Sequence, residues 1–261
     1  MTPKFLLLPL LPLLIVASPA AGQIQLPATP AAAPVRSAPA TLVLPSVSEL
    51  FGGAISDFRR LPSRSTVTWL SVGAAVALFA HAGDARVTNS LGANRYQGTF
   101  KAGAQIGGVP AQLGGALATY AVGRIAHSPR AASLGADLFQ AQILAQAMTQ
   151  GIKMATQRTR PDGTTLSFPS GHTSSAFASA TVLQRHFGWK AGLPAYAVAT
   201  YVATSRLEDK RHYLSDVAFG AVLGIVAGRT VTVGRGDARF AIAPAATSGG
   251  GAVAFTWVGR K

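Results

Sequence analysis

The sequence contains no cysteine among its 261 residues. Disulfide bonds, thiolate catalysis and cysteine-based zinc sites are therefore excluded. Acidic residues are also few, because 9 Asp and Glu stand against 23 Lys and Arg, which gives a formal net charge of +14. Such a basic chain suits anionic partners, namely nucleic acid, an anionic membrane surface or a phosphorylated substrate. Since no dense run of Lys and Arg is interleaved with aromatic residues, we do not expect nucleic acid to be the partner.

Long apolar runs are scarce as well. Only residues 65–83 and 102–123 lack charged side chains over nearly the length of a membrane span, and these intervals are 19 and 22 residues long. The second interval contains six glycines, one proline and two glutamines. Later intervals fall short of the roughly 20 residues that a span needs. We expect a compact helical domain that lies at a membrane surface, with one or two spans in the N-terminal half as the alternative.

The first residues have the pattern of a secretory signal. Lys4 supplies a positive charge, residues 5–17 are apolar, and small residues then offer cleavage after Ala20 or Gly22. An apolar run of 13 residues is short for a membrane anchor. We therefore predict that residues 1–22 are a signal peptide and that the protein is exported, to the periplasm or the outer face of the inner membrane.

The rest of the chain divides by composition. Five prolines among alanines mark residues 23–48, so residues 23–66 are predicted to be a linker and lead-in. Residues 67–232 have helical periodicity, and residues 233–261 alternate around "TSGGG", which predicts a β-hairpin with Val253, Phe255 and Trp257 on one face. The predicted fold is all-α, a bundle of about six helices with the site at one end. The expected helices are Val67–Ala82, Ile106–Ile125, Ser133–Met154, His172–Phe187, Lys190–Ser205 and Tyr213–Arg229.

Two short segments carry residues suited to binding an anion. In "KMATQRTRP", Lys153 and Arg160 are seven residues apart, so both would project from one side of a helix that continued through them. In "PSGH", Ser170, Gly171 and His172 come directly before an Ala/Ser/Thr-rich run. Taken alone, the first could be a solvated helix end and the second a simple N-cap.

A third segment, "SRLEDKRHYLSD", contains Arg206 and then His212 and Asp216. The last two have i, i+4 spacing, from which a carboxylate can hold an imidazole nitrogen on one helix face. Alone they could be a surface pair. However, two helical arms of similar length over residues 173–204 would form a hairpin that returns Arg206 to Ser170, so the three segments are expected to meet.

The joint order is Lys, six residues, Arg-Pro; then Pro-Ser-Gly-His; then Ser-Arg, five residues, His, three residues, Asp. This order resembles the signature of the type 2 phosphatidic acid phosphatase superfamily, which also contains bacterial class A acid phosphatases and vanadium haloperoxidases. The resemblance covers residues 153–216 by motif and about 67–229 by helical pattern. It implies a phosphatase that cleaves a phosphomonoester or pyrophosphate, most often of a lipid, through a phosphohistidine and with no metal or other cofactor.

Phosphoryl transfer spreads negative charge over three equatorial oxygens, so the enzyme needs fixed cations and N–H donors around them. We expect Lys153, Arg160 and Arg206 to supply the cations. Ser170 and Gly171 are expected to present the start of a helix to the same oxygens, because its backbone N–H groups point outward there.

The expected nucleophile is His212, oriented by Asp216, while His172 protonates the leaving oxygen and later activates water. The resemblance implies these same roles. Only residues 162–168 separate the first two blocks, which is shorter than is usual in the family and predicts an open site. Two alternatives stay open: a vanadate-dependent haloperoxidase with His212 as the vanadate ligand, and a non-catalytic anion-binding module of the envelope. Three histidines outside the blocks, His81, His127 and His186, are interpreted as structural or surface residues.

Overall fold

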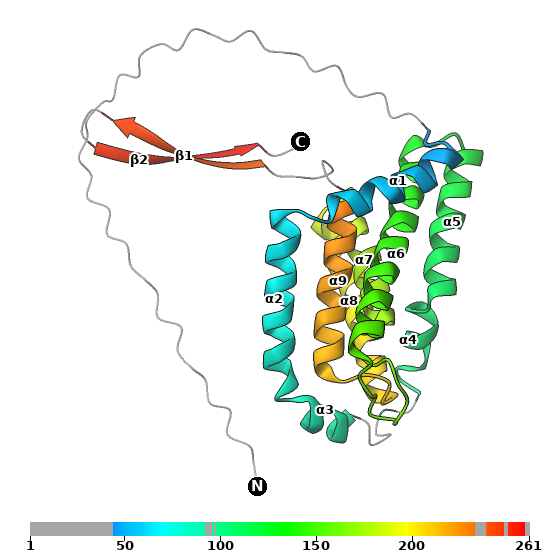
Figure 1. Ribbon diagram of the computed structural model, residues 1–261. Helices are drawn as coiled ribbons and strands as arrows, with labels where there is room; N and C mark the ends of the chain where they lie inside the picture. The colour runs from blue at the N-terminus through cyan, green and yellow to red at the C-terminus, as the bar shows by residue number, and fades with distance from the viewer. Residues whose placement is uncertain (1–43, 92–95, 97, 233–238, 248–249, 259–261) are drawn as a thin grey trace. The chain divides into compact units, whose positions relative to one another are not determined.

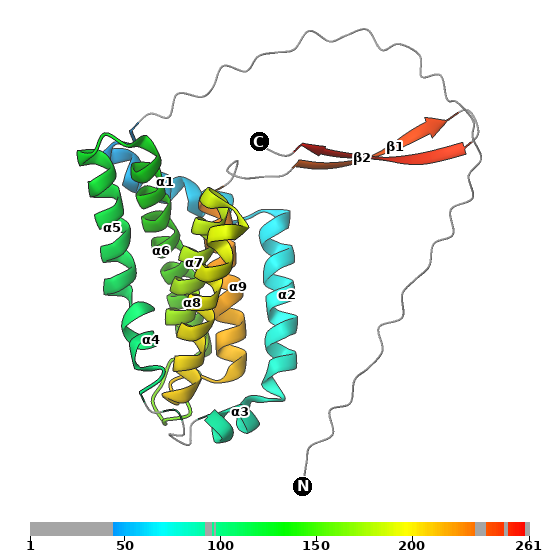
Figure 2. The ribbon, with the colours of Figure 1, turned by 180° about the vertical axis from the view of Figure 1, so that it is seen from behind.

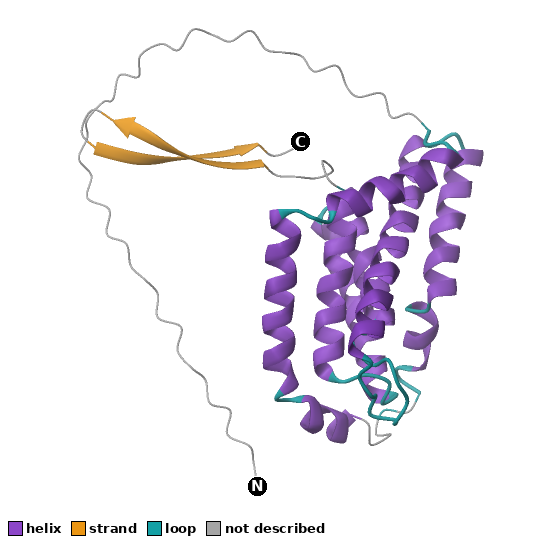
Figure 3. Cartoon of the chain, in the orientation of Figure 1, coloured by secondary structure: helices purple, strands orange, loops and turns teal. Residues whose placement is uncertain are grey.

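The computed structural model describes residues 44–91, 96, 98–232, 239–247 and 250–258 (Figures 1 and 3). The predicted signal peptide lies outside these residues. Nine helices occur within the described part of the chain. They are α1 Val47–Arg60, α2 Arg64–His81, α3 Asp84–Leu91, α4 Lys101–Ile106, α5 Val109–Ile125, α6 Pro129–Thr156, α7 Gly171–Phe187, α8 Trp189–Glu208 and α9 Leu214–Val231.

Three helices, α6, α7 and α9, pack against one another at the centre of the bundle, and each carries one outer helix. Helix α5 packs on α6, α8 on α7, and α2 on α9, and the same neighbours lie side by side in Figures 1 and 2. The central cluster consists mainly of small and medium residues, such as Ala141 and Leu144 of α6, Ala178 and Val182 of α7, and Ala227 of α9. Small side chains allow the helix axes to approach closely, which explains why alanine is so frequent here.

Glycines on one face of α9 set its distance from α7. A Cβ atom on Gly220 would lie 2.7 Å from the carbonyl oxygen of Ser170, and one on Gly224 would lie 2.3 Å from that of Ser174. A contact this short is impossible for a real side chain, so glycine is required at both positions. As a result, the first turn of α9 lies directly beside the first turn of α7.

The expectation of about six helices is too low for two physical reasons. Residues 23–66 were expected to be linker, yet Val47–Arg60 forms α1, which begins with a capping box between Ser46 and Glu49 and buries Leu50. The segment between the predicted helices 67–82 and 106–125 also forms two short helices, α3 and α4, and Gly107 and Gly108 separate α4 from α5. The other helix boundaries differ from the predicted ones by a few residues.

Residues Arg239–Thr247 (β1) and Gly250–Val258 (β2) pair as antiparallel strands, with Arg239 opposite Val258 and Thr247 opposite Gly250. Only the backbone of these strands is described, so the predicted shared face of Val253, Phe255 and Trp257 lies outside the described side chains. The extent of the C-terminal unit and its separation from the bundle stay predictions.

One described helix, α9, is long and apolar enough to cross a membrane, and α2 with α3 passes the same test as a pair bent by 66°. The core helix of a soluble protein also passes this test, and 67% of the α9 segment is buried inside the bundle. Length and apolarity therefore do not place the chain in a bilayer.

Candidate active site

The sequence-predicted residues gather at the end of the bundle where α6 and α8 finish and α7 and α9 begin. Helix α6 ends at Thr156, because Gln157 adopts a left-handed conformation with a φ of 47°. Lys153 is thus on the last turn of α6, whereas Arg160 lies on the following loop. The helix therefore does not continue through both cations, in agreement with the predicted helix end near Met154.

The loop nevertheless returns Arg160 to Lys153. The ammonium of Lys153 donates to the carbonyl oxygens of Leu166 and Ser167, the latter at 3.3 Å, and the Arg160 guanidinium lies 3.5 Å from the same Leu166 oxygen. Burial lowers the pKa of Lys153 to about 8, and the positive charge of Arg160 acts in the same direction. Two cations held this close repel each other, so an anion between them would be favourable.

Arg160 has a further feature of an anion site. Its Nε–H is buried and has no hydrogen-bond partner within the part of the chain that the structure describes. A buried donor that lacks a partner is costly, by about 1–3 kcal/mol. A bound oxyanion would remove that cost.

Helix α7 begins beside α9, as the Ser170 backbone shows. The N–H of Ser170 donates to the carbonyl oxygen of Asp216 at 3.0 Å, and Gly220 makes room for the contact. The Ser170 hydroxyl accepts from Thr173 Oγ1 at 3.0 Å rather than capping a backbone N–H. Its own hydrogen can therefore be donated to a ligand, next to the N–H groups of Gly171 and the first turn.

His212 and Asp216 come together, but not on one helix face. Helix α9 begins at Leu214, so His212 precedes it, and its N–H donates to the carbonyl oxygen of Arg206 at 3.3 Å. The Asp216 carboxylate reaches back over the N-terminus of α9 and accepts from the Tyr213 N–H at 2.9 Å. The i, i+4 prediction was therefore wrong about the helix, although the two side chains do meet.

In this structure the two side chains lie close together without a hydrogen bond between them. His212 Nδ1 lies 3.6 Å from Asp216 Oδ2, which is longer than a hydrogen bond. Burial lowers the pKa of His212, while the nearby Asp216 raises it, and the net direction is downward. The ring is thus neutral at pH 7. Catalytic hydrogen bonds often shorten only when substrate binds.

Asp216 is held by residues to which the sequence analysis gave no role. Its Oδ1 accepts from Arg158 at 2.7 Å and its Oδ2 accepts from the Ser167 hydroxyl. Burial raises the pKa of Asp216, but the donors and the positive charge around it outweigh that effect and hold the pKa below its usual value. The carboxylate is therefore ionised at neutral pH despite being fully buried.

Arg158 also connects this carboxylate to the N-terminal helices. Its second nitrogen, Nη2, donates to Asp84 Oδ2 at 2.8 Å, and the same carboxylate accepts from His81 Nδ1 at 2.8 Å and from the Ser215 hydroxyl at 2.7 Å. His81, interpreted from sequence as structural, is thus part of a network that ends at the site. Asp84 and Ser215 are 131 residues apart, so no local pattern could have predicted their contact.

The remaining pair, His172 and Arg206, also lies at this end of the bundle, where Arg206 is buried and His172 is partly buried. Burial lowers the pKa of His172 to about 4, and the positive charges of Arg206, His212 and Arg160 act in the same direction. Arg206 is anchored by Asp209 and by a 3.1 Å hydrogen bond from its Nε to Ser205. Three cations and two histidines, each buried or partly buried, thus act on one another electrostatically.

The predicted residues therefore lie on five segments that meet at one end of the bundle. Those segments are the last turn of α6, the loop after it, the start of α7, the end of α8 and the residues that lead into α9. Residues 134–239 match the sequence model of the PAP2 superfamily, and this region includes all five segments. Residues 134–239 are thus a PAP2 superfamily region.

Two curated relatives of this chain are named as phosphatases of lipid A. The lipid A 1-phosphatase of Porphyromonas gingivalis is 41% identical over 85 residues, which is 31% of this chain and 19% of that protein. The lipid A 4'-phosphatase of Helicobacter pylori is 28% identical over 99 residues, which is 33% of this chain and 50% of that protein. The matched regions thus cover half or less of each relative.

Two solved structures also resemble this chain. The crystal structure of Aquifex aeolicus LpxE has a TM-score of 0.49 and 20% identity and covers 57% of this chain and 93% of that one. The PAP2 type phosphatidylglycerolphosphate phosphatase of Bacillus subtilis has a TM-score of 0.45 and 17% identity and covers 71% and 94% of the two chains.

Proposed function

We propose that this chain is a phosphatase that hydrolyses a phosphomonoester or pyrophosphate of a lipid through a phosphohistidine on His212. The observation that carries the proposal is the meeting of Lys153, Arg160 and Arg206 with two histidines, of which the buried one, His212, lies beside an ionised carboxylate. The cations match the charge that spreads over the phosphoryl oxygens during transfer. A binding protein would need the cations but neither a nucleophile nor an acid.

In the first step, the Nε2 lone pair of His212 attacks phosphorus. The ring presents Nε2 because Nδ1 faces Asp216, and that carboxylate stabilises the positive charge that the ring gains. The P–N bond forms as the P–O bond to the leaving group breaks. The negative charge of the bound phosphate favours the imidazolium form of His172, whose pKa in the free protein is lowered to about 4 by burial and nearby positive charges. This imidazolium gives its proton to the leaving oxygen, which departs as an alcohol or a phosphate.

In the second step, water attacks the phosphohistidine. The neutral His172 takes a proton from the water as its oxygen bonds to phosphorus, and the P–N bond breaks with its electron pair returning to His212. Inorganic phosphate leaves, and both histidines regain their starting states. The cations and the first turn of α7 hold the phosphoryl oxygens throughout, so these steps need no metal ion.

The proposed substrate class rests on the relatives and on the loop. The two curated relatives are named as phosphatases of lipid A, a phosphorylated lipid. The seven-residue connection 162–168 is short, so a bulky headgroup meets little obstruction from it. These features support a lipid phosphate, and the basic charge of the chain favours an anionic headgroup.

We further infer that the protein is exported and associates with a membrane. The outer helices carry large exposed apolar side chains, among them Phe79 of α2 at 88% exposure and Ile125 of α5 at 79%. Large apolar side chains that are exposed in this way on the outer helices favour a contact with lipid or protein. After expression in a Gram-negative host, the chain is expected to lack residues 1–22 and to stay in the membrane pellet after carbonate extraction. Recovery in the soluble cytoplasmic fraction would contradict this.

The function is tested by assaying the full chain with lipid A, phosphatidate, isoprenyl pyrophosphate and p-nitrophenyl phosphate in the presence of a chelator. Phosphate release from at least one lipid substrate is expected, and the release should disappear in His212→Ala. Halide oxidation by peroxide after vanadate addition, without phosphate release, would instead identify the haloperoxidase. Phosphate binding without turnover of any substrate would identify a non-catalytic binding module.

The pH dependence should reveal the Lys153 charge. Because burial lowers the pKa of Lys153 to about 8, its ammonium is lost as the pH rises through that value. The pH dependence of kcat/KM reports the ionisation of the free enzyme. Above about pH 8 we expect kcat/KM to fall tenfold more per pH unit than it would if residue 153 kept its charge. A bound phosphate favours the ammonium, so the same fall in kcat should begin at higher pH. In Lys153→Arg the additional fall should vanish, since a guanidinium stays charged; an unchanged profile would contradict the role.

A further inference from the structure

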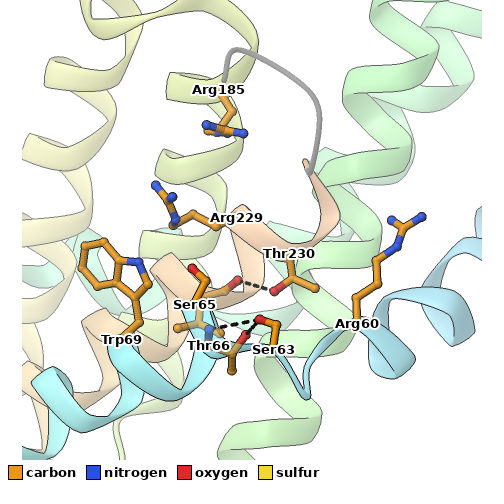
Figure 4. Close-up of a pocket in the computed structure, with 9 residues that line it drawn as sticks. Arg60, Ser63, Ser65, Thr66, Trp69, Arg185, Arg229 and Thr230 are labelled. Atoms are coloured by element: carbon orange, nitrogen blue, oxygen red, sulfur yellow. Dashed lines mark hydrogen bonds between the residues drawn. The ribbon is translucent and has the colours of Figure 1, made fainter. Parts of the chain in front are cut away.

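A second basic site lies at the other end of the bundle. Here a cavity of about 470 Å³ opens between the end of α1, the start of α2 and the last turns of α7 and α9. Figure 4 shows that its wall includes three arginines, Arg60, Arg185 and Arg229, together with Trp69 and the serines that begin α2. No acidic side chain is among the described residues that line it.

This cavity is separate from the candidate active site. Asp216 lies in the first turn of α9 and Arg229 in its last turn. Thirteen residues separate the two positions, which corresponds to about 20 Å along a helix. Helix α2 likewise runs from the cavity at Ser63 to His81, whose ring contacts the Arg158 network. A ligand in the cavity would therefore not touch the catalytic residues.

The arginines are held toward the cavity by neighbours of different kinds. Arg229 lies over the ring of Trp69, with its guanidinium carbon 5.5 Å from the ring centroid. Arg60 pairs with the buried Asp57 at 3.0 Å. Arg185 donates to both the hydroxyl and the carbonyl oxygen of Thr232. Asp57 balances the charge of Arg60, and no acidic side chain is among the described residues that line the cavity, so the charge of Arg229 favours an anion there.

The start of α2 adds neutral donors. The Ser63 hydroxyl accepts from the Thr66 N–H at 3.1 Å and caps the helix. The hydroxyl and backbone N–H of Ser65 are in the first turn, where N–H groups have no intrahelical acceptor and point outward from the helix. Arginine forks together with such donors are the groups that bind the oxygens of phosphate.

We propose that this cavity binds a phosphate ester anion, with the phosphate seated between Arg229, Arg60 and the first turn of α2. The face of Trp69 that Arg229 does not cover offers an apolar surface for the organic part of the ligand. The ligand is bound rather than hydrolysed, because no histidine lines the cavity among the described residues. Its source is either a lipid headgroup or a soluble phosphate.

The experiment uses the fluorescence of Trp69 in the full chain. The protein has three tryptophans, so Trp189→Phe and Trp257→Phe leave Trp69 as the sole reporter, and His212→Ala prevents turnover of the probe. Inorganic phosphate, short-chain phosphatidate and short-chain phosphatidylcholine are titrated separately. We expect a saturable response to phosphatidate whose midpoint rises at least tenfold in Arg229→Gln and in Arg60→Gln. Midpoints are compared because Arg229→Gln changes the starting emission of Trp69.

Arg130→Gln is the matched control, since Arg130 is exposed at the start of α6, at the same end of the bundle, and does not line the cavity. It should leave the midpoint unchanged. A response to both phosphate and phosphatidate means that free phosphate suffices, and a response to phosphatidate alone identifies a lipid headgroup. Either outcome supports the site. No saturable response, an equal response to phosphatidylcholine, or equal midpoints in Arg229→Gln, Arg60→Gln and Arg130→Gln would overturn it.

Discussion

Replacement of His212 by alanine is expected to reduce kcat by about 10⁴-fold or more, because the variant has no group that can accept the phosphoryl. The side chain is almost fully buried, so water cannot easily take its place at the attacking position. Substrate binding should change much less, since Lys153, Arg160 and Arg206 remain. The expected signature is therefore a loss in kcat with KM within a few-fold of the original.

Replacement of His172 by alanine should give a different result and provides the comparison. Its proposed role is to protonate the leaving oxygen, which p-nitrophenolate does not need because it is stable as an anion. With p-nitrophenyl phosphate, His172→Ala should release one equivalent of nitrophenol in a burst and then stall, since nothing activates the water. With an alkyl phosphate, the first step itself should be slow.

The phosphoenzyme distinguishes the two histidines directly. Labelled phosphate should accumulate on His172→Ala, survive in alkali and be lost in acid, as expected of a phosphohistidine, and none should appear on His212→Ala. Label on His212→Ala, or wild-type rates in that variant, would contradict the nucleophile assignment. A burst that is equal in both variants would contradict the assignment of His172.

The sequence predicted which residues would meet but not how the backbone holds them. The order and spacing of the three segments were enough to place Lys153, Arg160, Arg206 and both histidines at one end of a helical bundle. The helix hairpin argument was also sound, because α7 and α8 pack along their length through contacts such as Phe177 with Tyr196. Assignment of catalytic roles to these residues stays a prediction.

The local errors have a common cause. The spacing of the motif residues is compatible with helix at Arg160 and at His212, but the backbone is not helical at either position. Gln157 turns left-handed so that the loop can return, and the N–H of His212 pairs with the Arg206 carbonyl. For α1, a local signal did exist in the Ser46–Glu49 capping box, but the surrounding prolines favoured a linker.

Arg158 could not have been predicted, since its partners are remote in the chain. It lies between two motif residues, where sequence alone suggests a solvated cation. The structure places its guanidinium between Asp84 and Asp216, which are respectively 74 and 58 residues away along the chain. Each carboxylate is nearly or fully buried, so the position of Arg158 determines whether both can stay ionised.

Arg158→Met should therefore destabilise the protein strongly and also impair catalysis. Loss of one partner from a buried ion pair costs about 3–5 kcal/mol, which for a domain of this size lowers Tm by about 10 °C. The activity should fall because Arg158, together with the hydrogen bonds from His212, Ser167 and the Tyr213 N–H, lowers the pKa of Asp216, so that without Arg158 the carboxylate takes up a proton more readily and supports His212 less well. Thermal unfolding and kcat measure the two effects.

The pH profile separates a positioning role from a purely structural one. The depressed pKa of Asp216 contributes stability above the usual pKa of an aspartate, and this contribution is lost as the pH falls through the folded-state value. In Arg158→Met that pKa rises, so activity should be lost at a higher pH on the acid side than in the wild type. The difference in unfolding free energy between the two proteins should narrow below about pH 4.

Arg211→Met is the matched control for stability. Arg211 also pairs with an aspartate, Asp162, at 2.9 Å, but its side chain is 46% exposed. Exposed pairs of this kind contribute at most about 1 kcal/mol, so its Tm should stay within a few degrees of the wild type. Equal losses in both variants would show that burial of the Arg158 network is not what stabilises the fold. If Arg158→Met loses activity at the same acidic pH as the wild type, Arg158 does not act through Asp216.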